Sequence, residues 1–198
     1  MKKLESTLPN MVLSLLLICS IMAAALALVY GATKEPIAQA YIKGENDAVK
    51  EVVPAFDNDP NADQWEADGL VFYPAKKNGE LVGTAVKTFT ESGFSGRFDV
   101  MVGFLPDGTI YNSKVLSHKE TPGLGSKMSD PKFHDQFNNL KIEGNLSVKK
   151  DGGTIDAITA ATISSRAYCD AINRAHAALT NNNNTYDSTS GATKGGQE

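Results

Sequence analysis

The sequence has few of the residues that build metal centres or disulfide frameworks. Of its 198 residues, two are cysteine and three are histidine. Cys19 lies in an apolar run and Cys169 in the distant C-terminal region, so no intrachain disulfide is expected. His118, His134 and His176 fall in three segments without ligand-like spacing, and no metal site is predicted.

Positive charge is also scarce. Lysine and arginine number 19 against 23 acidic residues, which gives a formal net charge of −4 and a pI near 5.4. A broad basic surface is therefore not expected, and nucleic acid is excluded as the main partner. The length suffices for one domain with a sizeable core and an appendage.

Charged residues are absent from residues 11–31 (MVLSLLLICSIMAAALALVYG). This run has about the length of a helix that crosses a hydrocarbon core, so a single transmembrane helix is predicted. A signal peptide cleaved after Ala-Leu-Ala is the alternative, although the run exceeds the usual length of such a region. Lys2 and Lys3 precede the run. The positive-inside bias places residues 1–10 in the cytoplasm and the rest on the extracytoplasmic side.

Residues 32–68 combine a helical pattern with a polar loop. Apolar residues recur at helical spacing, with Pro36 suited to a first turn and Pro54 to a stop. A membrane-proximal helix, weakened at Gly44, is predicted. The following DNDPNADQWEADG predicts a loop. Its acidic residues do not follow the EF-hand pattern, which favours a solvated loop over a calcium site.

Residues 69–180 are predicted to form the folded domain, of α+β class, with an antiparallel sheet flanked by helices. Two apolar runs flank Asn78-Gly79, a dipeptide that supplies the positive φ values of a tight hairpin. A second hairpin turns at Asp107-Gly108, after a strand that alternates apolar residues on one face. An antiparallel sheet with one buried face is expected. The apolar residues of that strand are Phe98, Val100, Val102 and Phe104.

The C-terminal half of this domain is predicted to mix helices with a third hairpin. A short helix is expected within residues 126–140, and strands are expected at residues 146–150 and 154–159. After Thr162, apolar residues four apart predict an amphipathic helix packed on the sheet, with Cys169 as a small packing residue. The polar residues 181–198 are expected to be disordered.

Two glycine-containing loops are candidates for ligand contact. The first, Gly-Phe-Ser-Gly, permits close backbone approach at Ser95 and Gly96, and a flexible connection is the alternative. The second is Glu-Thr-Pro-Gly-Leu-Gly, in which proline and two glycines fix a compact turn. Such a turn would hold donors and one apolar side chain reproducibly, as a flat aromatic ligand requires; an ordinary strand-to-helix turn is the alternative. Its candidate contacts are Glu120, Thr121, Leu124 and Gly125.

The stretch from Asp156 to Ser165 (DAITAATISS) joins the end of an extended run to the start of a helix. Thr162 would present its hydroxyl at the helix N-terminus, where unpaired amides and the helix dipole stabilise an anion such as phosphate. Ala160 and Ala161 leave room for a bulky group. A threonine that caps the helix is the alternative interpretation.

Together these features resemble the family of FMN-binding subunits of membrane redox pumps, which includes the G subunit of the Rnf electron-transport complex and the C subunit of the sodium-translocating NADH:quinone reductase. The resemblance rests on the N-terminal span, the two loops and the motif Asp-x-x-(Ser/Thr)-(Gly/Ala)-Ala-Thr-x-(Ser/Thr). The residues that fit the motif are Asp156, Thr159, Ala160, Ala161, Thr162 and Ser164. The length of this chain favours the Rnf subunit over the quinone-reductase subunit.

The resemblance implies covalent FMN, joined through its phosphate to Thr162 by a separate flavin transferase that uses FAD and magnesium. It implies an electron-transfer subunit with partner subunits in a bacterial inner-membrane complex that couples ferredoxin and NAD oxidoreduction to ion transport, rather than an enzyme by itself. Its flavin contacts would be the motif residues and the candidates of the two loops.

Three alternatives stay open at this stage. One is a membrane-anchored module that binds flavin non-covalently or not at all, another is a stand-alone extracytoplasmic flavin reductase, and the third is the equivalent quinone-reductase subunit. A second copy of most of the motif ends at Thr193, but Gly195 replaces its closing Ser/Thr and no helix or strand is predicted around it. Thr162 is therefore favoured as the attachment site.

Overall fold

A computed structural model describes residues 7–190, with residues 182–190 described by their backbone alone. The chain divides after Lys43 into two compact units. The first contains most of helix α1 (Leu8–Val52), whose most apolar 18-residue window has a mean hydropathy of 2.8 and no buried residue. By length and composition this helix can cross a membrane.

Helix α1 is continuous where the sequence predicts two helices. Pro36 lies inside it rather than in the first turn of a new helix, and Gly44 does not interrupt it. An interior proline removes one helical hydrogen bond. The good helix formers on either side of Pro36, among them Glu35, Ala38 and Gln39, favour continuation of the helix.

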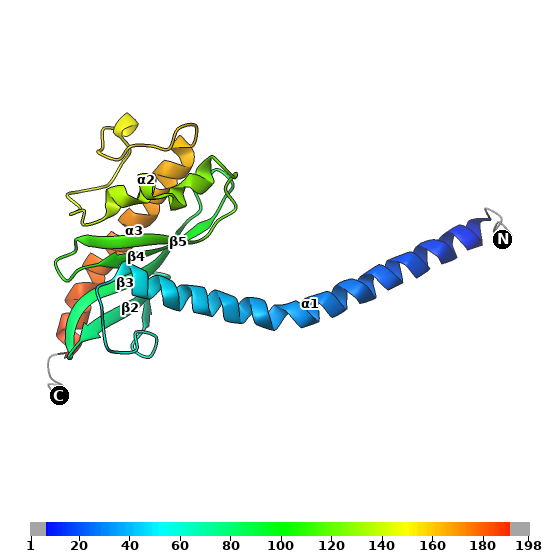
Figure 1. Ribbon diagram of the computed structural model, residues 1–198, viewed down its shortest axis with the longest axis horizontal. Coiled ribbons are helices and arrows are strands. Elements are labelled where there is room, and N and C mark those ends of the chain that lie inside the picture. Colours follow the sequence, from blue (N-terminus) through cyan, green and yellow to red (C-terminus); the bar gives the residue numbers. More distant parts are fainter. Residues whose placement is uncertain (1–6, 191–198) are drawn as a thin grey trace, which may run out of the picture. The chain divides into compact units, whose positions relative to one another are not determined.

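The second unit contains one five-stranded antiparallel sheet whose strands follow one another in chain order (Figure 1). The first two predicted hairpins are confirmed. Asn78 and Gly79 have φ values of 53° and 85°, as a two-residue turn with positive φ requires. The predicted loop before the sheet is wrong in one place, because a short edge strand forms there and Trp65 stacks on Phe72 with ring centroids 5.1 Å apart. The strands are β1 (Trp65–Ala67), β2 (Leu70–Lys77), β3 (Glu80–Thr90), β4 (Phe98–Phe104) and β5 (Ile110–Ser117).

One face of the sheet packs against helix α3 (Thr162–Ser190) and encloses the larger core. Cys169 is buried there as predicted, and burial raises the pKa of its thiol to about 12. Residues 181–190 continue the helix, so the predicted disorder is wrong for them. Residues 191–198, Thr193 included, lie outside the described residues. The four alternating residues of β4, namely Phe98, Val100, Val102 and Phe104, are all buried in this core.

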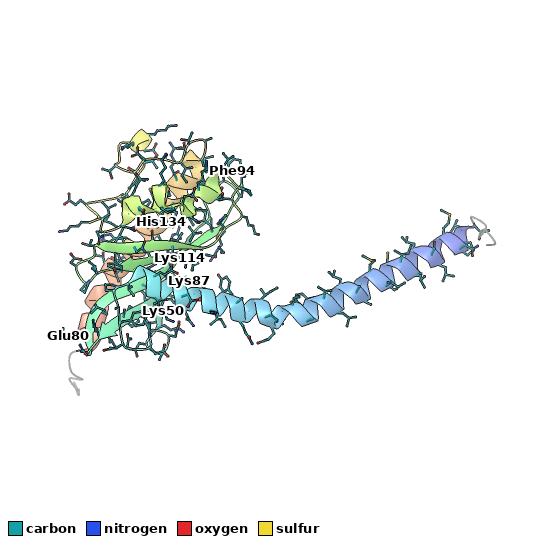
Figure 2. All side chains as sticks on the ribbon, viewed as in Figure 1. Lys50, Glu80, Lys87, Phe94, Lys114 and His134 are labelled. Carbon is teal, nitrogen blue, oxygen red and sulfur yellow. The ribbon has the colours of Figure 1, made fainter. Side chains whose placement is uncertain are left out.

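The opposite face of the sheet is also covered, which corrects the expectation of a single buried face. The last turns of α1 lie on it, where Val49 and Val52 are buried against Tyr73, Ala85 and Met101. Small residues make this possible, because a Cβ at Gly103 would lie 1.6 Å from the carbonyl oxygen of Val52. Lys87 and Lys114, labelled in Figure 2, pair with Glu45 and Glu51 of the helix.

We expect Gly103→Ala to lower the free energy of unfolding by about 3 kcal/mol, because the added methyl meets backbone that cannot move without separating helix from sheet. Urea unfolding of the full chain in detergent, followed by circular dichroism, measures the change. Gly44→Ala is the control, since a Cβ there meets nothing within 4 Å. It should raise stability by up to about 1 kcal/mol. Equal effects of the two substitutions would contradict the packing described.

The segment between β5 and α3 contains four short helical elements. The expected helix within residues 126–140 is present as three pieces: η1 (Gly125–Ser129), α2 (Pro131–His134) and η2 (Asp135–Phe137). The third hairpin is wrong. Val148 and Ile155 form one isolated parallel bridge, and η3 (Lys149–Asp151) lies between them. A Cβ at Gly153 would lie 2.0 Å from the Ser147 carbonyl oxygen, so the chain folds back too tightly for paired antiparallel strands.

Candidate functional site

A cavity of about 310 Å³ opens where the loop after β3, the turn after β5 and the first turn of α3 meet. Its volume lies at the lower end of the range for small-molecule sites. Eight of the residues that the sequence singles out line it, together with two that the sequence reasoning missed. The eight are Glu120, Thr121, Leu124, Gly125, Ala160, Ala161, Thr162 and Ser164, and the two are Phe94 and Ile163.

The chain reverses sharply just before α3. Ala161 N–H donates to the Ile158 carbonyl (3.0 Å), and Ala160 adopts a φ of +62° to complete the turn. The Ser165 hydroxyl stabilises the same turn, because it accepts from Ile158 N–H and donates to the Ala161 carbonyl, both at 2.9 Å. Ser165 is fully buried. No role was predicted for Ser165 from the sequence. Serine side chains near a helix start often bond to neighbouring backbone groups, and this tendency is the signal that could have indicated it.

Thr162 is the first residue of α3 and lines the cavity. Its hydroxyl forms no hydrogen bond with any residue whose side chain the structure describes, so the capping interpretation finds no support in this geometry. The first α-helical bond runs from Ser165 N–H to the Ala161 carbonyl at 3.1 Å. The amides of Thr162, Ile163 and Ser164 thus precede the hydrogen-bonded ladder, where an anion is favoured.

Ala160 occupies a conformation that glycine adopts without strain. For an L-residue with a side chain, the left-handed region costs roughly 1–2 kcal/mol. We expect Ala160→Gly to be neutral or to raise the free energy of unfolding by up to about 1 kcal/mol, since glycine's greater freedom in the unfolded chain offsets part of the gain. Ala160→Val should destabilise the protein, since a β-branched residue is a poor fit at positive φ. Urea unfolding of both variants tests this, and a more stable valine variant would contradict it.

The turn after β5 is held by its own hydrogen bonds. Leu124 N–H and Ser126 N–H both donate to the Thr121 carbonyl, at 3.1 and 3.3 Å, and Gly123 N–H donates to the Ser126 hydroxyl at 2.9 Å. Gly123 has a φ of +76°. The turn therefore presents the Leu124 side chain, 41% exposed, to the cavity in a fixed way.

The loop after β3 contributes differently from the prediction. Ser95 and Gly96 are not among the residues that line the cavity, whereas Phe94, 67% exposed, is. Figure 2 shows Phe94 at the edge of the folded unit. Ser95 acts through its backbone, because its N–H donates to Oε1 of Glu120 at 3.1 Å. Gly96 closes the loop by donating its N–H to the Gly93 carbonyl at 3.1 Å, with a φ of +93°.

Thr159 lies on the other side of the motif, in a second cavity of about 250 Å³ that also includes Asp156. The Gln136 side chain fixes this part of the motif. Its Oε1 accepts from Asp156 N–H (2.7 Å) and its Nε2 donates to the Asp156 carbonyl (3.2 Å). The carboxylate of Asp156 pairs with Lys149 at 2.7 Å. Asp156 and Thr159 are thus set apart from the cavity beside Thr162.

The cavity beside Thr162 combines apolar walls with a few polar groups. Phe94, Leu124 and Ile163 are large apolar side chains with substantial exposure. Neither lysine nor arginine is among the lining residues, so positive potential there comes from the amides at the start of α3. This arrangement suits a ligand with an apolar aromatic part and an anionic end.

Comparisons with known proteins relate the chain to a family. Residues 93–177 match the model of the FMN-binding domain family. A solved structure of the C subunit of a quinone reductase from Shewanella oneidensis has a similar fold, with a TM-score of 0.50 and 19% identity over 70% of each chain.

Two relatives share more of the sequence, and both are named as the G subunit of an ion-translocating oxidoreductase complex. The protein from Methanosarcina acetivorans is 33% identical over 173 residues, which are 84% of this chain and 91% of that one. The protein from Shewanella amazonensis is 35% identical over 175 residues, 80% of each chain. The chain therefore belongs to the family of G subunits of ion-translocating oxidoreductase complexes, and its residues 93–177 match the FMN-binding domain.

Proposed function

We propose that this chain is an electron-transfer subunit that carries FMN covalently on Thr162, within a membrane complex that couples ferredoxin and NAD oxidoreduction to ion transport. The observation that carries the proposal is the position of Thr162. Its hydroxyl has no partner among the described side chains and stands at the N-terminus of α3, beside a cavity with apolar walls.

The residues fit such a group. The amides of the first turn of α3 would hold the phosphate, and the absence of a bulky side chain at Ala160 and Ala161 leaves the approach open. Leu124 and Phe94, which line the cavity, would contact the aromatic ring. When bound, FMN supplies the electron chemistry, and the protein supplies orientation and electrostatics. Thr121 and Ser164, which line the same cavity, are proposed as further contacts.

Attachment requires a second protein, because a threonine hydroxyl is a weak nucleophile at neutral pH. In the proposed step, Thr162 Oγ forms a bond to the FMN phosphorus of FAD, and the bond from that phosphorus to the AMP phosphate oxygen breaks. AMP is the leaving group, and the hydroxyl proton passes to a base of the flavin transferase. The product is a phosphoester on Thr162.

The proposed location is supported by α1 and by the charges before it. This helix is long and apolar enough to anchor the chain in a membrane, and the relatives are named as subunits of an ion-translocating complex. The lysines before the apolar run favour a cytoplasmic N-terminus, with the flavin-bearing unit on the extracytoplasmic side. The other subunits of the complex are its proposed electron donor and acceptor partners.

Intact mass of the membrane-extracted chain tests the proposal. Expressed with a flavin transferase, the chain should gain the mass of one FMN less one water and stay yellow after acid precipitation. A peptide map should place the addition on the tryptic peptide that contains Thr162. A colourless chain of unmodified mass would overturn covalent attachment, and flavin lost on acid precipitation would favour a non-covalent site.

A further inference from the structure

Glu120 is a buried carboxylate on which three segments of the site converge. Glu120 is 5% exposed and forms no ion pair with any residue whose side chain is described. Oε1 accepts from Ser95 N–H at 3.1 Å, and Oε2 accepts from the Ser164 hydroxyl at 2.9 Å. One side chain therefore joins the loop after β3 to the first turn of α3, while its own backbone begins the turn after β5.

Two glycines make this convergence possible. A Cβ at Gly125 would lie 2.3 Å from Oε2 of Glu120 and 2.7 Å from the Ser164 hydroxyl oxygen. A Cβ at Gly93 would lie 2.8 Å from Oε1 and 2.3 Å from the Gly96 carbonyl oxygen. Neither glycine has positive φ, so each is needed for space rather than for backbone freedom. The loops are thus shaped around the carboxylate.

We propose that Glu120 is the positioning residue of the flavin site and that its negative charge lowers the reduction potential of the bound flavin. The inference rests on the proposed function, since it needs flavin on Thr162. Positioning follows from geometry, because Ser164 lies two residues after Thr162 and its hydroxyl is fixed by Oε2. Glu120 also lines the cavity, so its charge would lie beside the bound flavin.

The electrostatic effect has a definite sign. Reduction adds electrons to the flavin, and a nearby negative charge disfavours that addition, most strongly where water is excluded. No lysine or arginine lines the cavity to offset the charge. The two hydrogen bonds to Glu120 come from neutral groups, which reduce the charge's effect without cancelling it.

Two substitutions separate positioning from charge. Glu120→Gln has the same shape and keeps both hydrogen bonds if its amide nitrogen donates to Ser164, whose hydroxyl can accept. Glu120→Ala loses both. The full chain is co-expressed with the flavin transferase, and flavin attachment and midpoint potential are measured. Glu91→Gln is the matched control, because Glu91 begins the loop after β3 that Glu120 bonds through Ser95, its side chain is 63% exposed and it does not line the cavity.

We expect Glu120→Ala to slow flavin attachment at least about tenfold, given the two lost hydrogen bonds to a charged group. Glu120→Gln should restore attachment to near the wild-type rate and shift the midpoint potential to more positive values, while Glu91→Gln changes neither. Wild-type potential in Glu120→Gln would overturn the inference, even where Glu120→Ala does not fold. Normal attachment in Glu120→Ala would overturn the positioning role. A wild-type chain without flavin would instead overturn the proposed function.

Discussion

Thr162→Val is expected to abolish covalent flavin attachment while the protein stays folded. Valine has nearly the shape of threonine but no hydroxyl, so the phosphoester cannot form. Because the Thr162 side chain has no hydrogen-bond partner among the described residues, its loss should change the free energy of unfolding by no more than about 0.5 kcal/mol. In-gel flavin fluorescence after denaturing electrophoresis measures attachment.

Two controls accompany this substitution. Thr193→Val alters the second copy of the motif, beyond the described residues, and should leave fluorescence unchanged. Thr162→Ser keeps a hydroxyl at the start of α3 and should retain flavin, at reduced or full yield. Persistent fluorescence in Thr162→Val would refute the assignment. Loss of fluorescence in both Thr162→Val and Thr193→Val would point to an effect on the transferase rather than on one acceptor hydroxyl.

Part of the cavity beside Thr162 could be predicted from the sequence. The loop Glu-Thr-Pro-Gly-Leu-Gly and the motif around Thr162 each carry local signals, namely turn-forming residues and a helix start, and the structure brings both to one cavity. That Glu120 faces Ser164 rather than solvent could not be predicted. It depends on a contact between residues 44 positions apart, and local sequence patterns do not predict contacts over that separation.

The same limit explains the errors around the motif. Phe94 follows no periodic pattern, and Ile163 belongs to the apolar series that predicts a packed helix face yet is 48% exposed, so their place at the cavity depends on tertiary structure. Residues 146–150 and 154–159 alternate as strands do, but the close approach of Gly153 to Ser147 replaces the ladder by one bridge. Short segments of this kind satisfy strand and loop patterns equally, and only packing decides between them.

The end of α1 is a second place where the prediction from the sequence was wrong. The sequence indicates a separate membrane-proximal helix, but residues 44–53 form part of the core of the second unit. The signal was present in Ala85 and Gly103, small residues of the sheet next to larger residues of the core that faces α3, Val86 and Phe104. The missing side chain at Gly103 lets the end of α1 approach the sheet closely, so both faces of the sheet are packed.

Removal of residues 1–53 is accordingly expected to unfold the flavin-binding unit, whereas removal of residues 1–43 should leave it folded. The longer deletion exposes the sheet face that contains Tyr73 and Met101, through the loss of the buried side chains of Ala48, Val49, Val52 and Val53. At about 1.5 kcal/mol for each valine and less for alanine, roughly 5 kcal/mol of burial is lost. That is comparable to the whole stability of a small domain.

Urea unfolding of the two fragments, followed by circular dichroism, compares them directly. Glu51→Gln in the shorter deletion is the matched control, because it breaks the pair with Lys114 but keeps the apolar contacts. The side chains of this pair are 56% and 38% exposed, so the loss should be no more than about 1 kcal/mol. Equal midpoints for the two fragments would show that the helix end is only a tether. Unequal midpoints, with little effect of Glu51→Gln, would mean that apolar packing makes the end of α1 part of the flavin-binding fold.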